Sequence, residues 1–157
     1  MKNFFDLFSL PQKFSIDFSV LEKKYLEFQK QFHPDKSSSD DISKSIEINE
    51  AYKILSDDFL RACYLLRLKG VDILNDERAV KVDITTLEQQ LELQEKISEI
   101  SKDEIDELRK KINSEFKQLI AEAMEVFDIK TSAQLLVKAK YLKKSLEDLK
   151  MRKQKLI

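Results

Sequence analysis

The chain has 157 residues, of which 42% are hydrophobic and 36% charged, and its net charge is −1. One Gly and two Pro argue against a turn-rich β protein, while a single Cys and a single His exclude a disulfide framework and multi-Cys or His-rich metal sites. No apolar run reaches the roughly 20 residues that span a bilayer, and the first residues have the pattern of neither a signal peptide nor a transit peptide. We therefore expect a cytoplasmic protein of the all-α class.

The first long predicted helix covers residues 17–32. Its apolar side chains recur at about 100° per residue, which is the period of an amphipathic helix. They are Leu21, Tyr25, Phe28 and Phe32. Pro34 ends this helix, because the residue before a proline is pushed out of the α-helical region.

Two more helices are predicted before residue 71. After a polar loop, Asp41 can cap a helix over 42–56. A shorter helix then starts at Asp57-Asp58 and ends at Gly70, a residue type that suits the position after a helix C-terminus. Cys63 lies within this shorter helix, where we expect a buried apolar residue and not a ligand.

The helical pattern lapses over residues 71–83, which we interpret as a linker, and then returns in three longer segments. Ser101 with Glu104 three residues later has the spacing of a capping box, and Thr131 or Ser132 can cap the last helix. Short connections between long helices predict an antiparallel three-helix bundle. Its helices are expected at 84–100, 101–127 and 131–156.

The charges of the predicted bundle are segregated along the chain. Residues 84–108 hold eight acidic and two basic side chains, whereas residues 131–157 hold eight basic and two acidic ones. A basic helix alone would suggest nucleic-acid binding. Because an acidic segment of equal and opposite charge lies in the same small bundle, mutual neutralisation is the simpler explanation, and we expect no nucleic-acid partner.

The tripeptide His33-Pro34-Asp35 lies between two amphipathic helices. The preceding helix ends in Gln-Lys-Gln-Phe-His-Pro-Asp-Lys (29–36), the next one carries Ile-Asn-Glu-Ala-Tyr-Lys-Ile-Leu (48–55), and the chain begins with Phe-Asp-Leu-Phe-Ser-Leu-Pro at 5–11. In this combination the N-terminal part resembles the J domain of the DnaJ-type co-chaperones. The whole chain is similar to the HscB-type family of J proteins, through Leu-Glu-Leu-Gln-Glu (91–95), its length and its helical C-terminal half.

This resemblance implies a J domain over 1–70, a linker over 71–83 and a three-helix bundle over 84–157 that binds a scaffold protein. It implies a co-chaperone and not an enzyme: one that stimulates the ATPase of an HscA-type heat-shock chaperone and delivers the IscU-type iron–sulfur scaffold to it. Some eukaryotic members carry zinc on a Cys-rich N-terminal extension. This sequence has no such stretch, so we expect no cofactor, no metal, no membrane partner and a bacterial-type cytoplasmic setting.

The residues expected to bind the chaperone lie on the first long helix and the loop after it. They are His33, Pro34, Asp35, Lys23, Lys24 and Lys30. The lysines would meet an acidic surface and steer encounter. A solvated helix face is the alternative for the lysines, and a loop residue without a role is the alternative for His33. Catalysis by His33 with Asp35 lacks a nucleophile and a pocket.

The helix over 84–100 has two apolar faces. Leu93, Ile97 and Ile100 suit the bundle core, whereas Leu87 and Leu91 lie roughly opposite among acidic residues, as in a partner surface. The resemblance implies a scaffold-binding surface at the matching positions. Its expected residues are Leu87, Leu91, Glu92, Glu95, Glu99 and Tyr141.

Two further features bear on the extent of this surface. Val137 and Tyr141 fall off the main leucine stripe of the last helix, and we expect both to be exposed. Glu88 stands where the family often has Met, so we leave it out of the surface. The alternative is that Leu87 and Leu91 pack under the J domain. Two other functions also stay open: a J-domain co-chaperone for a different client, and a structural interaction protein in which His-Pro-Asp is accidental.

Overall fold

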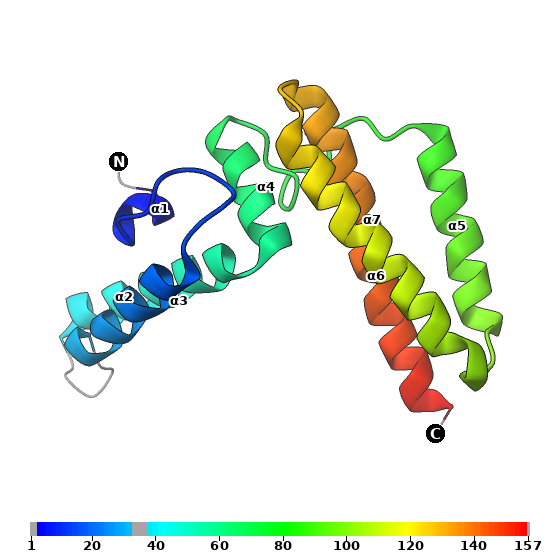
Figure 1. Cartoon of the computed structure of the whole chain (residues 1–157), viewed down its shortest axis with the longest axis horizontal. Coiled ribbons are helices and arrows are strands. Elements are labelled where there is room, and N and C mark those ends of the chain that lie inside the picture. Colours follow the sequence, from blue (N-terminus) through cyan, green and yellow to red (C-terminus); the bar gives the residue numbers. More distant parts are fainter. Residues whose placement is uncertain (1–2, 33–37, 157) are drawn as a thin grey trace. The chain divides into compact units, whose positions relative to one another are not determined.

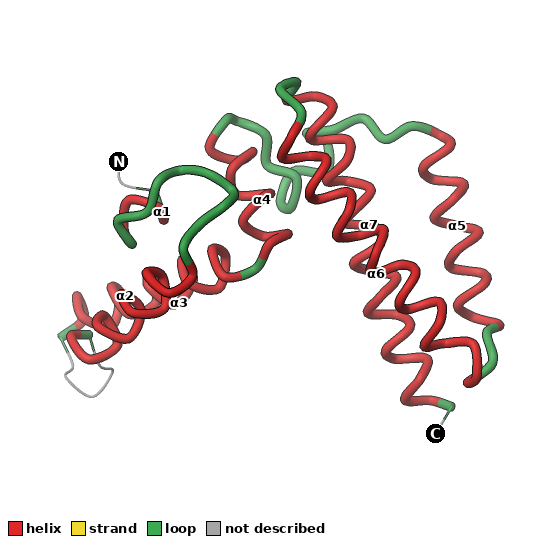
Figure 2. Tube along the Cα trace, viewed as in Figure 1, coloured by secondary structure: helices red, strands yellow, loops and turns green. Residues whose placement is uncertain are grey.

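The computed structural model of this chain describes residues 3–32 and 38–156, which form seven helices and no strand (Figures 1 and 2). The all-α prediction is confirmed. The helices are α1 (Phe4–Leu7), α2 (Phe18–Gln31), α3 (Ser39–Ser56), α4 (Asp58–Leu68), α5 (Ile84–Glu99), α6 (Lys102–Glu125) and α7 (Ile129–Lys155). The chain divides into two compact units, residues 1–65 and 66–157, with the boundary inside α4.

The first unit is built around the hairpin of α2 and α3, which lie side by side in Figures 1 and 2. Its buried side chains come mainly from α1, the loop after it, α2, α3 and the first part of α4. They include Phe5, Phe8, Leu10, Leu21, Ile48, Ala51, Leu55, Phe59 and Ala62. Cys63 is buried with them, as expected.

Helix α3 starts earlier than the sequence pattern predicts. Ser38, and not Asp41, is its N-cap: the Ser38 hydroxyl accepts a hydrogen bond from the Asp41 backbone N–H at 3.2 Å. The first turn is therefore Ser39-Asp40-Asp41, in which the two carboxylates favour the positive end of the helix dipole. A wholly polar first turn adds nothing to the apolar periodicity, which is why the pattern alone placed the start three residues later.

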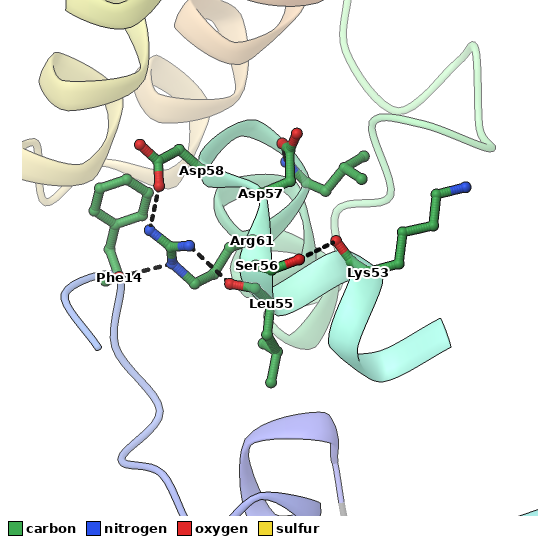
Figure 3. A network of polar contacts seen from close by, with 8 residues as sticks. Phe14, Lys53, Leu55, Ser56, Asp57, Asp58 and Arg61 are labelled. Atoms are coloured by element: carbon green, nitrogen blue, oxygen red, sulfur yellow. Dashed lines mark hydrogen bonds and ion pairs between the residues drawn. The ribbon is translucent and has the colours of Figure 1, made fainter. Parts of the chain in front are cut away.

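Arg61 of α4 is buried. Its guanidinium group makes hydrogen bonds to the loop before α2, to the C-terminal end of α3 and to the start of α4 (Figure 3). Its Nε donates to the Phe14 carbonyl at 2.8 Å and one terminal nitrogen donates to the Leu55 carbonyl, also at 2.8 Å. The other terminal nitrogen pairs with the Asp58 carboxylate at 2.7 Å. The Phe14 ring lies 4.5 Å from the guanidinium carbon, so a cation–π contact adds to the hydrogen bonds.

Replacing Arg61 by Leu should lower the free energy of unfolding of the protein by about 3 kcal/mol, because the buried Leu55 carbonyl and the partly buried Phe14 carbonyl lose their donor. Chemical denaturation followed by circular dichroism measures this. Arg67→Leu is the matched control, since Arg67 is exposed on the same helix and should cost about 0.5 kcal/mol or less. Equal losses in the two variants would contradict the structural role of the Arg61 contacts.

Helix α4 ends just before Gly70, the single glycine of the chain, as the sequence predicts. Gly70 has φ +97°, a left-handed conformation that Gly adopts without steric cost. The Val71 N–H donates to the Leu66 carbonyl and the Gly70 N–H donates to the Arg67 carbonyl, both at 3.0 Å. These two hydrogen bonds are the Schellman motif, which satisfies the last carbonyls of the helix.

The second unit contains α5, α6 and α7, which alternate in direction along the chain (Figure 1). Their core cluster comprises Ile97, Ile100, Ile105, Leu108, Ile112, Leu142 and Leu149, with Leu93, Phe116, Leu119, Leu146 and Leu156 packed against it. Helix α7 packs along α6 and also against α5. None of the helices in the described ranges 3–32 and 38–156 has an apolar stretch long enough to cross a bilayer.

Two of the predicted caps in this unit differ from the structure. Asp128 caps α7, and its carboxylate accepts the backbone N–H groups of Lys130 and Thr131; neither Thr131 nor Ser132 is the cap. Ser132 is instead buried, where its hydroxyl donates to the Ala123 carbonyl at 2.8 Å. Ser101 does hold the N-cap position of α6, but its hydroxyl donates to the Glu104 carboxylate and makes no cap to the backbone.

The segment 71–83 has no helix, yet it packs onto α7. Ile73 is buried, and its carbonyl accepts a hydrogen bond from Lys140 Nζ at 3.2 Å. Val80 and Val82 line the same cavities as Val137 of α7. The prediction that Val137 is exposed is therefore wrong, because this segment covers the side of α7 on which Val137 lies.

Candidate functional sites

The candidate chaperone-binding site is carried by α2. Lys23 and Lys30 are exposed and stand seven residues apart, so they share one face of the helix. Glu27 lies between them on that face and moderates their combined positive charge. Lys24 is half-buried and turned aside, since its Nζ donates to the Ser9 hydroxyl at 3.1 Å. Of the three predicted lysines, two thus form one exposed pair and the third is engaged elsewhere.

His33, Pro34 and Asp35 lie outside the described residues. The structure does describe the helices on either side of them. The rings of Tyr25 of α2 and Tyr52 of α3 stack with their centroids 3.9 Å apart, and this contact joins the two helices of the hairpin.

A polar contact reinforces the stacked tyrosines. Asn49 Oδ1 accepts hydrogen bonds from the Tyr25 hydroxyl and from Gln29 Nε2, both at 2.8 Å. Stacking and shared hydrogen bonds both fix the approach of α2 to α3. Sequence periodicity missed the role of Asn49, because a polar residue beside an apolar stripe gives no periodic signal.

The candidate scaffold-binding site lies on α5 and α7. Leu87 and Leu91 are four residues apart and keep 43% and 65% of their surface exposed. Side chains with this spacing stand above one another on one helix face. Ile97 and Ile100 are buried in the bundle core, so α5 has one face in the core and a separate apolar strip in solvent, as its pattern predicts.

The predicted acidic residues surround this leucine strip unevenly. Glu95 and Glu99 are exposed and one helical turn apart on α5. Glu92 lines a cavity of about 350 Å³ that is formed by α5, α6 and α7, and half-buried Tyr141 lines the same cavity. Neither Leu87 nor Leu91 belongs to that lining.

Tyr141 is nevertheless joined to the part of α5 that carries the leucines. Its carbonyl accepts a hydrogen bond from Gln90 Nε2 at 3.4 Å. Gln90 follows Leu87 by three residues and immediately precedes Leu91. The leucine strip therefore adjoins the contact between α5 and α7 at which Tyr141 lies.

Aspartate caps set where these helices begin. Hydrogen bonds from the Thr86 side chain and backbone N–H lower the pKa of Asp83, the N-cap of α5, below its usual range. The Thr131 side chain and backbone lower the pKa of Asp128 in the same way, and the Ser19 side chain and backbone lower that of Asp17. Lys153 lowers the pKa of Asp106 through a hydrogen bond of 3.1 Å and through its charge, which is one instance of the expected pairing between acidic and basic segments.

These lowered pKa values predict a loss of stability in acid. A carboxylate whose pKa is lower in the folded state binds fewer protons there than in the unfolded chain, so its contribution is present above the unfolded pKa and is lost as pH falls through the folded one. The free energy of unfolding should therefore stay level from pH 7 to about pH 5 and decline below about pH 4. Urea unfolding across this pH range measures the decline.

The variant Asp83→Asn with Asp128→Asn is the control for this pH dependence. Asn also caps helices but does not titrate. The double variant should keep its helices at pH 7 and lose less stability than the wild type between pH 5 and pH 3. An unchanged acid profile would contradict the assignment to these caps.

The described ranges 3–32 and 38–156 contain no group of three or more His, Cys, Asp and Glu side chains placed to hold a metal ion. The arrangement offers surfaces for protein contact: an exposed basic pair on α2 and an exposed leucine strip on α5. Neither surface has the oriented nucleophile and base that a hydrolytic site requires.

Comparison with known proteins identifies both units. The DnaJ domain model matches residues 3–64, and the model described as the HSCB C-terminal oligomerisation domain matches residues 82–150. The chain is thus a J-domain protein whose second unit is an HscB-type helical domain.

Curated relatives of this chain are similar to it over most of its length. A co-chaperone protein HscB homolog of Psychromonas ingrahamii is 43% identical over 113 residues, which cover 68% of this chain and 66% of that protein. One of Vibrio vulnificus is 39% identical over 105 residues, covering 62% of this chain and 61% of that protein. The chain belongs to the HscB family, whose two domain models it matches in order. The matched stretch spans slightly less than two thirds of these curated relatives.

Solved structures agree in fold over the whole chain. Chaperone HscB from Vibrio cholerae superimposes with a TM-score of 0.81 at 25% identity, covering 99% of this chain and 100% of that one. Human co-chaperone protein HscB gives a TM-score of 0.85 at 24% identity, covering 98% of this chain and 83% of that one. The predicted fold, a J domain followed by a helical C-terminal domain, is confirmed.

Proposed function

We propose that this chain stimulates the ATPase of an HscA-type heat-shock chaperone and delivers an IscU-type iron–sulfur scaffold protein to it. The first unit engages the chaperone through His33, Pro34 and Asp35, with Lys23 and Lys30 in support. The second unit binds the scaffold. The chain itself carries no cofactor, since the iron–sulfur cluster is the cargo of the scaffold. The activity belongs to the bacterial cytoplasm.

The chaperone half of the proposal is supported by the J-domain match and by charge. A J domain implies an Hsp70-type partner. Lys23 and Lys30 are exposed on one face of α2 and would steer an acidic surface toward the loop that follows. Because Lys24 is bonded to Ser9, we assign it a smaller part in this contact.

The observation that carries the scaffold half is the exposure of Leu87 and Leu91 on a helix whose opposite face is already in the core. An apolar strip that packing does not require is typical of a partner surface. Glu95 and Glu99 border this strip. Tyr141, whose side chain lines the cavity of α5, α6 and α7 and whose carbonyl is bonded to Gln90, offers a large side chain with a polar tip. We assign Glu92 to the rim of the surface, because it lines the cavity that α5, α6 and α7 form.

The test measures the ATPase rate of an HscA-type chaperone alone, with this protein, with an apo IscU-type scaffold, and with both. We expect the protein to raise the rate and the protein with the scaffold to raise it further. Stimulation that the scaffold does not change would favour a J-domain co-chaperone for another client. No stimulation at all would contradict the proposal and leave a structural interaction protein.

A further inference from the structure

A polar contact joins the part of α5 that carries the leucine strip to α7. The side-chain nitrogens of Gln90 and Gln94, one helical turn apart, both point at the hydroxyl of Ser145, at 3.2 and 3.4 Å. The same Gln90 nitrogen also lies 3.4 Å from the Tyr141 carbonyl. We call Gln90, Gln94 and Ser145 the amide clamp.

Ser145 is completely buried, so this contact is not made by surface side chains that meet by chance. A hydroxyl oxygen can accept two hydrogen bonds, and here the two glutamine amides use both. A glutamine NH₂ group has two N–H donors, which lets Gln90 bond Ser145 and the Tyr141 carbonyl together.

The clamp acts on the middle of α5, while the buried core residues of this helix lie mainly at its C-terminal end. Ile97 and Ile100 at its C-terminal end are buried in the bundle cluster. Leu87 and Leu91 are exposed and make no part of that cluster. In this part of α5 Thr86 is buried and Leu93 packs against the cluster, and the two glutamines supply the side-chain hydrogen bonds to α7. Hydrogen bonds depend on direction more than apolar contacts do, so the clamp sets the rotation of this part of α5 against α7.

We propose that Gln90, Gln94 and Ser145 are positioning residues for the scaffold-binding surface. They hold Leu87 and Leu91 at one orientation relative to Tyr141, so that a partner meets the three apolar side chains already arranged. Preorganisation of this kind raises affinity by removing the ordering cost at binding. The inference rests on the proposed function, because it needs a scaffold that uses these three side chains.

The test measures binding of an apo IscU-type scaffold to the full chain by calorimetry. Ser145→Ala should weaken the affinity about fivefold to tenfold, the effect of losing one or two neutral hydrogen bonds. Gln90→Met with Gln94→Met, which keeps side-chain length and removes the amides, should weaken it to a similar degree. Combining the two changes should add little, because both remove the same contact. ATPase stimulation without scaffold should not change.

A second readout separates positioning from general stability. In a Leu87→Ala and Leu91→Ala background, Ser145→Ala should change scaffold affinity less than twofold, since there are no leucines left to orient. Hydrogen exchange should become faster at the N-terminal half of α5 and stay unchanged in α6.

Each contrary outcome points to a different failure. If Leu91→Ala weakens scaffold binding and neither clamp variant does, the clamp has no positioning role while the proposed function stands. An equal effect of Ser145→Ala with and without the leucines would also overturn the positioning role. If Leu87→Ala with Leu91→Ala leaves binding unchanged, the scaffold surface itself is wrong, and the clamp proposal falls with it.

Discussion

A His33→Gln variant should lose stimulation of the chaperone ATPase while keeping its helical content and melting temperature. The reason for the functional loss is the position of His33 in the His-Pro-Asp motif of a domain that matches the DnaJ model. Stability should change by roughly 0.5 kcal/mol or less, because the substitution lies between α2, which ends at Gln31, and α3, which begins at Ser39. The ATPase rate and thermal denaturation measure the two effects separately.

Gln31→Ala is the matched control for this variant. Gln31 is exposed in the last turn of α2, two residues before His33, and belongs to no predicted site. It should leave stimulation close to the wild-type rate. If His33→Gln unfolds the protein, His33 has a structural role; if stimulation survives in a folded variant, the chaperone interpretation of the motif is wrong.

The long helices were predictable because their apolar periodicity is strong, but their starts depend on polar residues that carry no such signal. The first turn of α3 is Ser39-Asp40-Asp41, and α7 begins at Ile129 behind an Asp128 cap. In both cases an earlier capping side chain was available in the sequence, and only the hydrogen bonds decide which one caps.

The buried face of α7 shows a second limit of periodicity. Leu135, Ala139, Leu142 and Leu146 follow one another at helical spacing and would form one apolar stripe, whereas the structure buries Leu136 completely and leaves Leu135 half-buried. Helix α7 packs against both α5 and α6 and is also covered by segment 71–83. A helix with three neighbours has a broad buried face, so a single stripe cannot describe it and Val137 was wrongly placed in solvent.

The exposed apolar strip on α5 could be derived from the residues, because Leu87 and Leu91 fall outside the stripe that the core needs. The amide clamp could not be derived from the residues in this way. Gln90 and Gln94 are ordinary helix-surface residues by type, and their partner Ser145 lies more than 50 residues further along the chain. Only the packing of α5 on α7 brings them together, and helical periodicity contains no information about that contact.

A triple variant, Leu87→Ala with Leu91→Ala and Tyr141→Ala, should weaken binding of an IscU-type scaffold by about two orders of magnitude or more. Truncating an anchor at the centre of an interface commonly costs about 2 kcal/mol, and the three effects are not additive. Stability should fall little for the leucines, which are 43% and 65% exposed, and somewhat more for half-buried Tyr141. Calorimetric titration with the scaffold measures the affinity.

The matched control removes apolar surface from α7 outside the predicted surface. Met151 of α7 is exposed and lies ten residues from Tyr141, and Met151→Ala should leave scaffold affinity within about twofold. Neither variant should change ATPase stimulation measured without scaffold, because the J domain lies in the first unit. If the triple variant loses much of its melting temperature and keeps its scaffold affinity, these side chains serve packing. The scaffold would then have to bind another face of the second unit, since exposure alone does not make a surface an interface.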